Sequence, residues 1–472
     1  MSENIQKNPL PCGGGLGMGE TQSIKQGYKQ TSLGILPQEW EVVRLGDICE
    51  FIKTYQNARS DLNENDEISY IHYGEIHTKY KHFIDFAKAK LPKINAKKLV
   101  KEFQEIAFCQ SGDLVVVDAS EDYTAVAKSV EIQNLNSKAV AGLHTFLLRD
   151  KANYFANGFK GYILYNSEVY NELKRLATGI SVLSISKTNL SNLQIPLPPL
   201  AEQEKIAQIL GVWDKGISVL KSLIEAKTKR KKALMQRLLI PPCESPTPSL
   251  RASETSAAIY NKSVDCHDLT ASNLAMTEKN SKAKQSLRFA EFTDKWQEMR
   301  LGDICEIKKG EQLNKLSLSN NSEGKFAVIN GGILPSGYTD KFNTNENTIT
   351  ISEGGNSCGF VNFIKEKFWS GGHCYAIMNS KASVLYLYYF LKFKETFIQE
   401  LRVGSGLPNI QKKDIENFKV SFPALAEQKK IAQVLSVCDK EIELLKSKFQ
   451  CLKTQKKGLM QRLLNGEVRV KC

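Results

Sequence analysis

The segment Leu200-Ala-Glu-Gln-Glu-Lys-Ile-Ala-Gln-Ile-Leu210 returns 225 residues later as Leu425-Ala-Glu-Gln-Lys-Lys-Ile-Ala-Gln-Val-Leu435. The match runs on to a shared Leu-Met-Gln-Arg-Leu-Leu, so that 24 of the 40 positions in 200–239 and 425–464 are identical. A long match at one offset indicates an internal repeat, which has to be recognised before any other assignment. The chain is therefore a duplicated unit.

Both copies carry apolar residues at alternating steps of four and three, the a and d positions of a coiled coil. The pattern predicts two helices of about 40 residues, each ~60 Å long, with prolines before them and Asn465-Gly466 as a C-cap after the second. The predicted apolar seam consists of Ile206, Leu210, Trp213, Ile217, Leu220, Ile224, Leu234 and Leu238 in the first copy and Ile431, Leu435, Cys438, Ile442, Leu445, Phe449, Leu452, Leu459 and Leu463 in the second.

Two such helices in one chain most simply pair with each other. The alternative is that each packs on its own globular segment, although a strict heptad seam is narrower than an ordinary core-facing stripe. An antiparallel pair would place the two globular segments at opposite ends in inverted orientation, whereas a parallel pair would crowd both at one end.

A second repeated segment opens each half. Trp40-Glu-Val-Val-Arg-Leu-Gly-Asp-Ile-Cys-Glu50 returns as Trp296-Gln-Glu-Met-Arg-Leu-Gly-Asp-Ile-Cys-Glu306, with 8 of 11 positions identical. The 160 residues of 40–199 and the 129 residues of 296–424 show no clear match beyond these openings. The pattern indicates one scaffold that carries two different heads.

Each head mixes short β-branched or aromatic runs with helical stretches such as 384–400, which predicts an α+β fold. Predicted strands include 114–117, 348–352, 360–364 and 374–378. The expected domains are an N-terminal tail (1–39), head one (40–199), the first helical region (200–240), a flexible linker and re-entry segment (241–295), head two (296–424) and the second helical region (425–472).

Charge and composition are those of a globular protein without a membrane helix. The net charge is +13, with 42% hydrophobic and 24% charged residues, as in a soluble globular protein. Eleven of the thirteen excess positive charges fall in 200–240 and 425–472, so the heads are nearly neutral. No apolar run approaches the ~20 residues of a membrane helix, and the eleven cysteines form no C-x-x-C pair. We expect a cytoplasmic protein with reduced thiols.

Catalytic and metal-binding motifs were sought and none is convincing. Gly14 to Thr21 has the glycine spacing of a phosphate loop but places Glu20 where the phosphate-pairing lysine belongs. Neither Pro-Pro pair has the Asp/Asn-Pro-Pro-Tyr/Phe form that adenine amino-methyltransferases use. His72, His77 and His82 recur every five residues, a spacing that suits neither one helix face nor one strand face. We expect no catalytic residue and no metal site.

The heads instead carry polar, aromatic and glycine-rich segments whose side chains could contact bases and phosphates. Ordinary turns between strands are the alternative interpretation of such segments. The candidate DNA-binding residues are Tyr70, His72, Glu75, His77, Thr78, Lys79 and Lys81 in head one and Asn330, Ser336, Tyr338, Ser352, Glu353, Asn356 and Ser357 in head two.

The doubled layout, the Trp-x-x-x-Arg-Leu-Gly-Asp-Ile-Cys openings, the Pro-Leu-Pro-Pro-Leu-Ala-Glu-Gln-x-x-Ile-Ala segment at 196–207 and the Leu-Met-Gln-Arg-Leu-Leu segments strongly resemble the DNA specificity subunit of type I restriction–modification systems. The Ser-Glu-Gly-Gly-Asn-Ser turn at 352–357 and Phe368-Trp-Ser-Gly-Gly-His373 also resemble a target recognition domain of that family. Two features depart from this resemblance. The linker at 241–286 is longer than expected between the halves, and Cys438 stands where the first copy has Trp213, so the two seams are not equivalent.

The resemblance implies two target recognition domains joined by a long antiparallel two-helix coiled coil with a pseudo-two-fold internal repeat. Each domain would recognise one half of a bipartite, asymmetric site in double-stranded DNA. The helices would set the spacer and dock two methyltransferase subunits, which recruit restriction subunits. S-adenosylmethionine, ATP and Mg²⁺ would be used by those partners, and this chain would be a non-catalytic subunit that binds no cofactor and no membrane.

Two alternatives remain open at this stage. The chain could be a coiled-coil adaptor whose heads bind proteins or glycans, which retained site-specific methylation after exchange of both heads would favour. It could also be the specificity subunit of a fused methyltransferase-nuclease system, which the neighbouring reading frames would decide.

Overall fold

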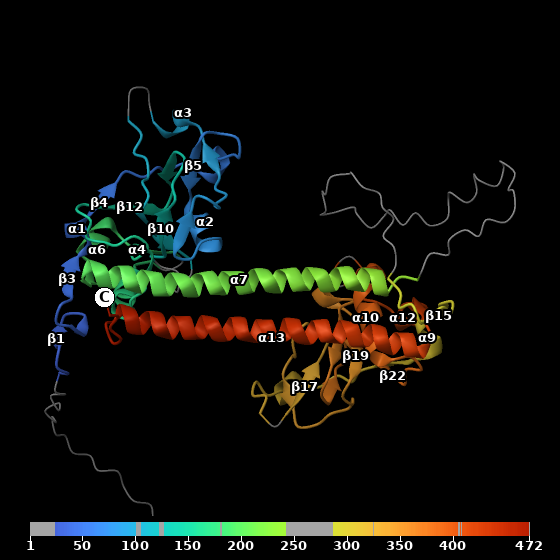
Figure 1. Cartoon of the computed structure of the whole chain (residues 1–472). Coiled ribbons are helices and arrows are strands. Elements are labelled where there is room, and N and C mark those ends of the chain that lie inside the picture. Colours follow the sequence, from blue (N-terminus) through green and yellow to red (C-terminus); the bar gives the residue numbers. More distant parts are fainter. Residues whose placement is uncertain are drawn as a thin grey trace, which may run out of the picture. The chain divides into compact units, whose positions relative to one another are not determined.

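The computed structural model describes residues 24–100, 105–121, 127–179, 182–241, 287–323, 325–404, 406 and 408–471. The chain divides into two compact units, of which unit 1 comprises residues 1–219 and 449–472 and unit 2 comprises 220–448. Each unit thus contains one head and parts of both long helices, α7 (Leu200–Leu238) and α13 (Leu425–Leu464), labelled in Figure 1.

Unit 1 contains fourteen named strands in its described part. In chain order they are β1 (Tyr28–Thr31), β2 (Gly34–Pro37), β3 (Glu41–Arg44), β4 (Cys49–Ile52), β5 (Ile68–Ile71), β6 (Phe83–Asp85), β7 (Lys93–Ile94), β8 (Leu114–Val117), β9 (Ala119–Ser120), β10 (Ser129–Gln133), β11 (Ala139–Ala141), β12 (Thr145–Asp150), β13 (Leu183–Ser184) and β14 (Gln194–Leu197). Its short helices are α1 (Leu45–Ile48), η1 (Arg59–Asp61), α2 (Tyr73–Thr78), α3 (Ala96–Leu99), α4 (Lys160–Ile163), α5 (Ser167–Leu176) and α6 (Lys187–Asn192).

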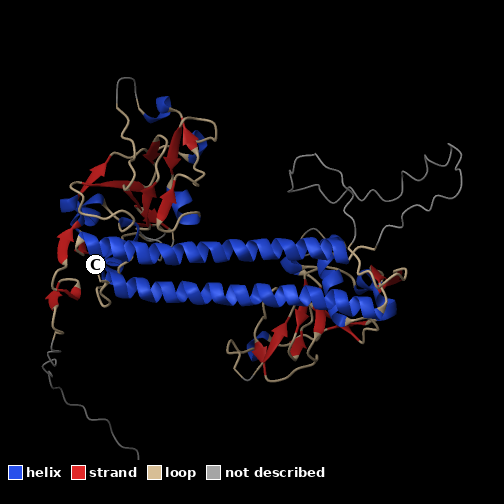
Figure 2. Cartoon of the chain, in the orientation of Figure 1, coloured by secondary structure: helices blue, strands red, loops and turns tan. Residues whose placement is uncertain are grey.

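Head one is built on a five-stranded sheet in the order β4-β12-β8-β10-β6 and a three-stranded sheet in the order β11-β5-β7. Strand β8 is buried along its whole length, as its Leu-Val-Val-Val sequence favours. The helices α4, α5 and α6 contribute Tyr162, Leu173 and Leu190 to a core that also takes in the start of α7. Figure 2 shows the sheets in red and the helices in blue.

Unit 2 has nine named strands in its described part: β15 (Gln297–Arg300), β16 (Glu306–Lys309), β17 (Phe326–Ile329), β18 (Tyr338–Thr339), β19 (Thr348–Ser352), β20 (Val361–Ile364), β21 (Phe368–Ser370), β22 (Cys374–Met378) and β23 (Lys419–Phe422). Its short helices are α9 (Leu301–Ile304), η3 (Lys315–Ser317), η4 (Gly355–Ser357), α10 (Val384–Phe393), α11 (Glu395–Glu400) and α12 (Lys412–Glu416). The sheets have the orders β16-β22-β19-β20 and β18-β17-β21.

The two heads share one topology, although their sequences show no clear match. The order β4-β12-β8-β10 in head one corresponds to β16-β22-β19-β20 in head two, with the strands in the same chain order. The small sheets correspond as well, because the central strand of each pairs in parallel with one neighbour and antiparallel with the other. The heads differ in sequence and in added strands such as β6, but the same arrangement of strands is common to both.

Within each unit the segments of α7 and α13 run antiparallel. In unit 1, Ile206 and Leu210 near the start of α7 share a core with Leu463 near the end of α13. In unit 2, Leu238 near the end of α7 shares a core with Ile431 near the start of α13. Every predicted seam position on both helices is buried or half-buried, while the positions between seam residues are mostly exposed.

Some sequence-based boundaries need correction, and others fall outside the described residues. Residues 28–37, assigned to the N-terminal tail, form the hairpin β1–β2, whose Leu36 lies in the core of unit 1. The linker expected at 241–286 and the segment from Gly14 to Thr21 lie almost wholly outside the described residues. No helix in the described part of the chain is long and apolar enough to cross a membrane.

Candidate nucleic-acid interface

The repeated Leu-Ala-Glu-Gln motif anchors the start of each long helix to its head. Gln203 donates to the Pro198 carbonyl and accepts from the Ala156 backbone N–H, and Gln428 makes the same contacts with Pro423 and Ser383. The Pro198 and Pro423 carbonyls lie just before the helices, and the Ala156 and Ser383 N–H groups belong to the heads. The repeated glutamine therefore serves a structural junction in both units.

The neighbouring glutamate of the motif forms buried ion pairs. Glu202 accepts from Arg469 and from the Trp40 indole, and Glu427 accepts from Arg288 at 2.9 Å. Arg469 follows the end of α13 in the sequence, and Arg288 follows the end of α7. The motif thus ties each head to both helices.

A tyrosine–aspartate–lysine triad joins each head to the helix pair. In unit 1, the Tyr162 hydroxyl donates to Asp214 at 2.7 Å and Lys456 donates to the same oxygen at 2.5 Å. Burial opposes the charge of Asp214, but the bonds from Lys456 and Tyr162 outweigh it and hold the pKa of this carboxyl below its usual range. Burial lowers the pKa of Lys456 to about 8 despite the Asp214 charge.

Unit 2 repeats this triad with Tyr389, Asp439 and Lys231. Its Lys231 side chain is 17% exposed, whereas that of Lys456 is 2% exposed. Lys227 also pairs with Glu441 across the helices of unit 2. Lys227, Lys231 and Lys456 continue the steps of four and three that define the seams, although they are not apolar. Each of them pairs with an acid on the other helix.

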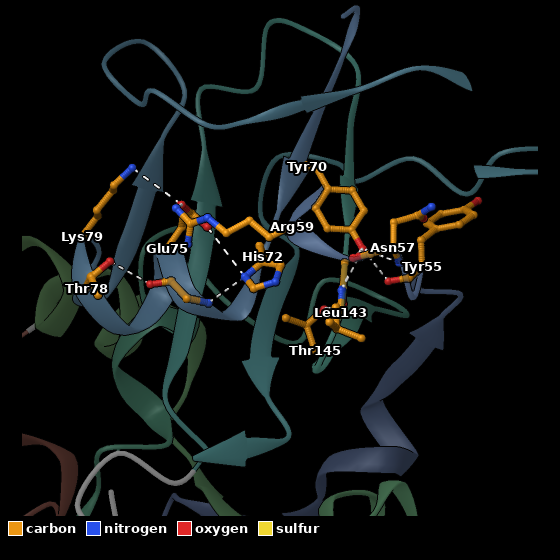
Figure 3. A network of polar contacts seen from close by, with 12 residues as sticks. Tyr55, Asn57, Arg59, Tyr70, His72, Glu75, Thr78, Lys79, Leu143 and Thr145 are labelled. Atoms are coloured by element: carbon orange, nitrogen blue, oxygen red, sulfur yellow. Dashed lines mark hydrogen bonds and ion pairs between the residues drawn. The ribbon is translucent and has the colours of Figure 1, made fainter. Parts of the chain in front are cut away.

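In head one, the segment 70–81 leads from β5 into α2, and Figure 3 shows its polar network. His72 caps α2 by accepting from the Gly74 N–H at 3.1 Å, as a polar N-cap residue should. Glu75 is buried, and Arg59 and Lys79 lie 3.4 and 3.7 Å from it, with the basic side chains 72% and 52% exposed. The carboxylate thus holds two exposed cations at the surface of the head.

Tyr70 is fully buried, and its hydroxyl bonds to backbone groups of several loops in head one. Its hydroxyl donates to the Tyr55 carbonyl and accepts from the N–H groups of Asn57 and Leu143. A Cβ on Gly142 would lie 2.0 Å from the Tyr70 ring, so the close approach requires glycine there. Tyr70 therefore positions the surrounding loops and does not face solvent.

The structure narrows the predicted set in head one. Tyr70, His72 and Glu75 are buried, and His77 is half-buried, while Thr78, Lys79 and Lys81 are exposed. Tyr73 lies between His72 and His77 in the network, with its ring 5.3 Å from that of His144. Arg59 and His144 also lie at this surface but fall outside the predicted segment. Tyr73 lies within the segment but was not among the predicted residues.

In head two, the predicted residues lie at the ends of β17, β18 and β19. Ser352 and Glu353 are buried, Asn330, Tyr338 and Ser357 are half-buried, and Ser336 and Asn356 are exposed. Glu353 accepts from Lys309 and from the Tyr375 hydroxyl. His373 lies 3.5 Å from the same carboxylate, and its backbone N–H donates to Asn330. The loops after β17 and β19 and before β22 therefore meet at one site.

The described residues contain no group of three or more His, Cys, Asp or Glu side chains that could hold a metal ion. His72 and His77 belong to the network of α2, whereas His82 lies apart in the core against Tyr162 and Tyr165. The three histidines, spaced five residues apart, therefore do not share one site. Cys266 and His267, in the expected linker, lie outside the described residues.

Comparison with known proteins places this geometry in context. A family model described as "Type I restriction modification DNA specificity domain" matches residues 37–227 and 293–454. The putative type I restriction enzyme MjaX specificity subunit of Methanocaldococcus jannaschii is 27% identical over 463 residues, covering 95% of this chain and 98% of that protein. A putative type I specificity subunit of Mycoplasma pneumoniae is 36% identical over 154 residues, covering 32% of this chain and 40% of the relative.

Among solved structures, the crystal structure of a type I restriction–modification S subunit from M. genitalium superposes with a TM-score of 0.53 at 18% identity. The superposition covers 90% of this chain and 96% of that one. At this identity the likeness concerns the fold.

Proposed function

Because this chain belongs to the type I restriction modification DNA specificity family, we propose that it is the DNA-recognition subunit of a type I restriction–modification complex. Each head recognises one half of a bipartite, asymmetric site in double-stranded DNA. The chain itself carries no catalytic residue. S-adenosylmethionine, ATP and Mg²⁺ are used by methyltransferase and restriction subunits that assemble with it.

One observation carries this proposal: two heads of the same topology present different polar side chains at equivalent loops. A common framework with different loop residues is suited to recognising two different base sequences, because base-edge contacts specify sequence while the scaffold sets position. The near-neutral heads fit a role in which base contacts supply specificity and partner subunits contribute phosphate contacts.

We propose further that α7 and α13 form one antiparallel coiled coil that acts as the spacer and docks two methyltransferase subunits. The alternating seam on both helices and the matching triads support this role. Heads inverted about such a pair would address half-sites about one helical turn, ~34 Å, apart on the duplex. The excess positive charge of the helical segments would face DNA or an acidic partner surface.

The proposal is tested by making the two heads identical. The segments Leu45–Glu50 and Leu301–Glu306 have the same sequence, and Leu45 and Leu301 make the same backbone bond, to Leu193 and Phe418. Residues 45–193 can therefore be replaced by residues 301–418 at matching junctions. Long-read methylation sequencing of the host should show the asymmetric motif replaced by a symmetric one built from its second half.

An unchanged motif would contradict the proposal, because the heads would then not determine the sequence methylated. The reciprocal exchange, which places residues 45–193 in the second half, is the matched control and should give a symmetric motif built from the first half. Methyl transfer by the purified chain alone would contradict the non-catalytic role.

A further inference from the structure

Each head contains a histidine–carboxylate pair at the same place in its fold. In head one, His144 Nδ1 lies 3.1 Å from Asp118 Oδ1. In head two, His373 Nδ1 lies 3.5 Å from Glu353 Oε2. The surrounding sequences show no clear match, so the correspondence becomes visible only through the strands.

The equivalence rests on strand register. Asp118 directly follows β8 and Glu353 directly follows β19, while the histidines directly precede β12 and β22. In both sheets the last residue of the first strand pairs with the first residue of the second, Val117 with Thr145 and Ser352 with Cys374.

Backbone hydrogen bonds confirm the match residue by residue. The Asp118 N–H donates to the His144 carbonyl, and the Glu353 N–H donates to the His373 carbonyl, at 3.1 and 3.0 Å. Two residues before each histidine, Gly142 and Gly371 donate to the last residues of β5 and β17. The pair therefore occupies one defined position in a framework whose other loop residues have changed.

The pairs lie within the candidate sites, and the histidine of each pair is open to solvent. The His144 and His373 side chains are 47% and 65% exposed. His144 packs edge-on against Tyr73 in the network of α2, and His373 lies beside Asn330 and Glu353. The histidine is thus the exposed member of each pair.

The chemistry of each pair favours a hydrogen-bond donor as the group that it binds. A carboxylate only accepts hydrogen bonds, so a neutral imidazole that donates to it through Nδ1 presents Nε2 as an acceptor. A phosphate has no proton to donate, and a neighbouring carboxylate would repel it. The exocyclic amino groups of adenine and cytosine are donors in the major groove.

We propose that His144 and His373 each accept a hydrogen bond from the exocyclic amino group of an adenine or cytosine, one in each half-site. Asp118 and Glu353 are positioning residues that hold the rings. This inference rests on the proposed function and names the specific contacts made by the two heads.

The test uses the complex purified from the host through the tagged full-length chain, with duplexes that carry its methylated motif. At each adenine or cytosine, an analogue that lacks the amino group, purine or 2-pyrimidinone, replaces the base. Wild type should lose about tenfold in affinity at one position of each half-site, as expected for one base contact. His144→Asn should be about tenfold weaker on the natural site and insensitive to the analogue at one position.

His373→Asn should do the same at one position of the other half-site, so each variant is the matched control of the other. Asparagine is chosen because His144 has a φ of 56°, a conformation that asparagine adopts more readily than most other residues. Asp118→Asn, which retains an acceptor, should weaken the analogue effect partially at the same position as His144→Asn. Thermal unfolding of each complex checks that the variants are folded.

Three results would overturn the inference. A His144→Asn complex that weakens equally on all sequences and shows a shallower salt dependence would indicate a phosphate contact. Variants that bind like wild type would indicate no contact, and a wild type insensitive to every amino-group deletion would exclude this mode of recognition. If the wild-type complex methylates no bipartite motif, the proposed function itself fails, which is a separate result.

Discussion

At the scale of single residues, His82 is a histidine kept from protonation by the fold. It lies in the core of unit 1 against Tyr162 and Tyr165, with Nδ1 3.1 Å from the Gly161 carbonyl. Its Nε2 is buried without a hydrogen-bond partner among the described residues. Burial, reinforced by the Lys456 charge, lowers the pKa of His82 to about 3 from an ordinary value of 6.5.

His82 should make unit 1 sensitive to acid. Between pH 6.5 and about 3 the unfolded chain binds a proton that the folded chain does not, so the free energy of unfolding falls as the pH falls. Between pH 7 and 5 the loss should be about 2 kcal/mol. Denaturant unfolding at both pH values should show this loss in wild type and a smaller one in His82→Phe.

The exposed His373 provides the control, because His373→Phe should retain the full pH dependence. Equal pH dependence in wild type and His82→Phe would mean that another group is responsible.

At the scale of elements, the triads explain why lysines stand in an apolar seam. Tyr162 comes from α4, Asp214 from α7 and Lys456 from α13, so one cluster connects a head to both helices. A buried ion pair contributes little net stability when complete, but leaves a costly unpaired charge when one partner is removed. Such a cluster favours the one register in which its members meet.

Asp214→Asn should therefore destabilise unit 1 by about 3 kcal/mol, because the buried Lys456 would lose its counter-ion. Asp439→Asn is the matched variant in unit 2, where Lys231 is more exposed and the loss should be smaller. Hydrogen–deuterium exchange by mass spectrometry should show faster exchange in peptides of head one for the first variant and of head two for the second.

The double variant Asp214→Leu with Lys456→Met should recover much of the lost protection, because it removes both charges. A single Asp214→Asn variant with unaltered exchange would contradict the structural role of the triad.

At the scale of the whole molecule, the proposed spacer role predicts the effect of lengthening both helices. Seven residues inserted into each, between Asp214 and Lys227 in α7 and between Glu441 and Lys456 in α13, keep the heptad phase and leave the triads intact. Seven helical residues add about 10 Å. The methylated motif should acquire a longer spacer while both half-sites stay the same.

Long-read methylation sequencing measures this directly. An unchanged spacer with methylation retained would contradict the role of the helices as a ruler. An insertion in α7 alone breaks the match between the two seams, and we expect it to abolish methylation of the original motif.

Local and repeated features of this protein could be predicted from its amino-acid sequence. The two long helices and several strands, including 114–117, 348–352 and 374–378, were predicted correctly, because helical periodicity and β-branched runs are local signals. The family resemblance, which the family model confirms, was also present in short repeated motifs.

Only the tertiary structure decided the common topology of the heads, the burial of Tyr70 and the pairing of His144 with Asp118 and of His373 with Glu353. The members of each pair stand 26 and 20 residues apart in the sequence. They meet because neighbouring strands align their ends, and strand order depends on contacts between distant segments rather than on local pattern. Side chains can therefore change until two heads no longer match in sequence, while hydrogen bonds between strands keep the same positions side by side.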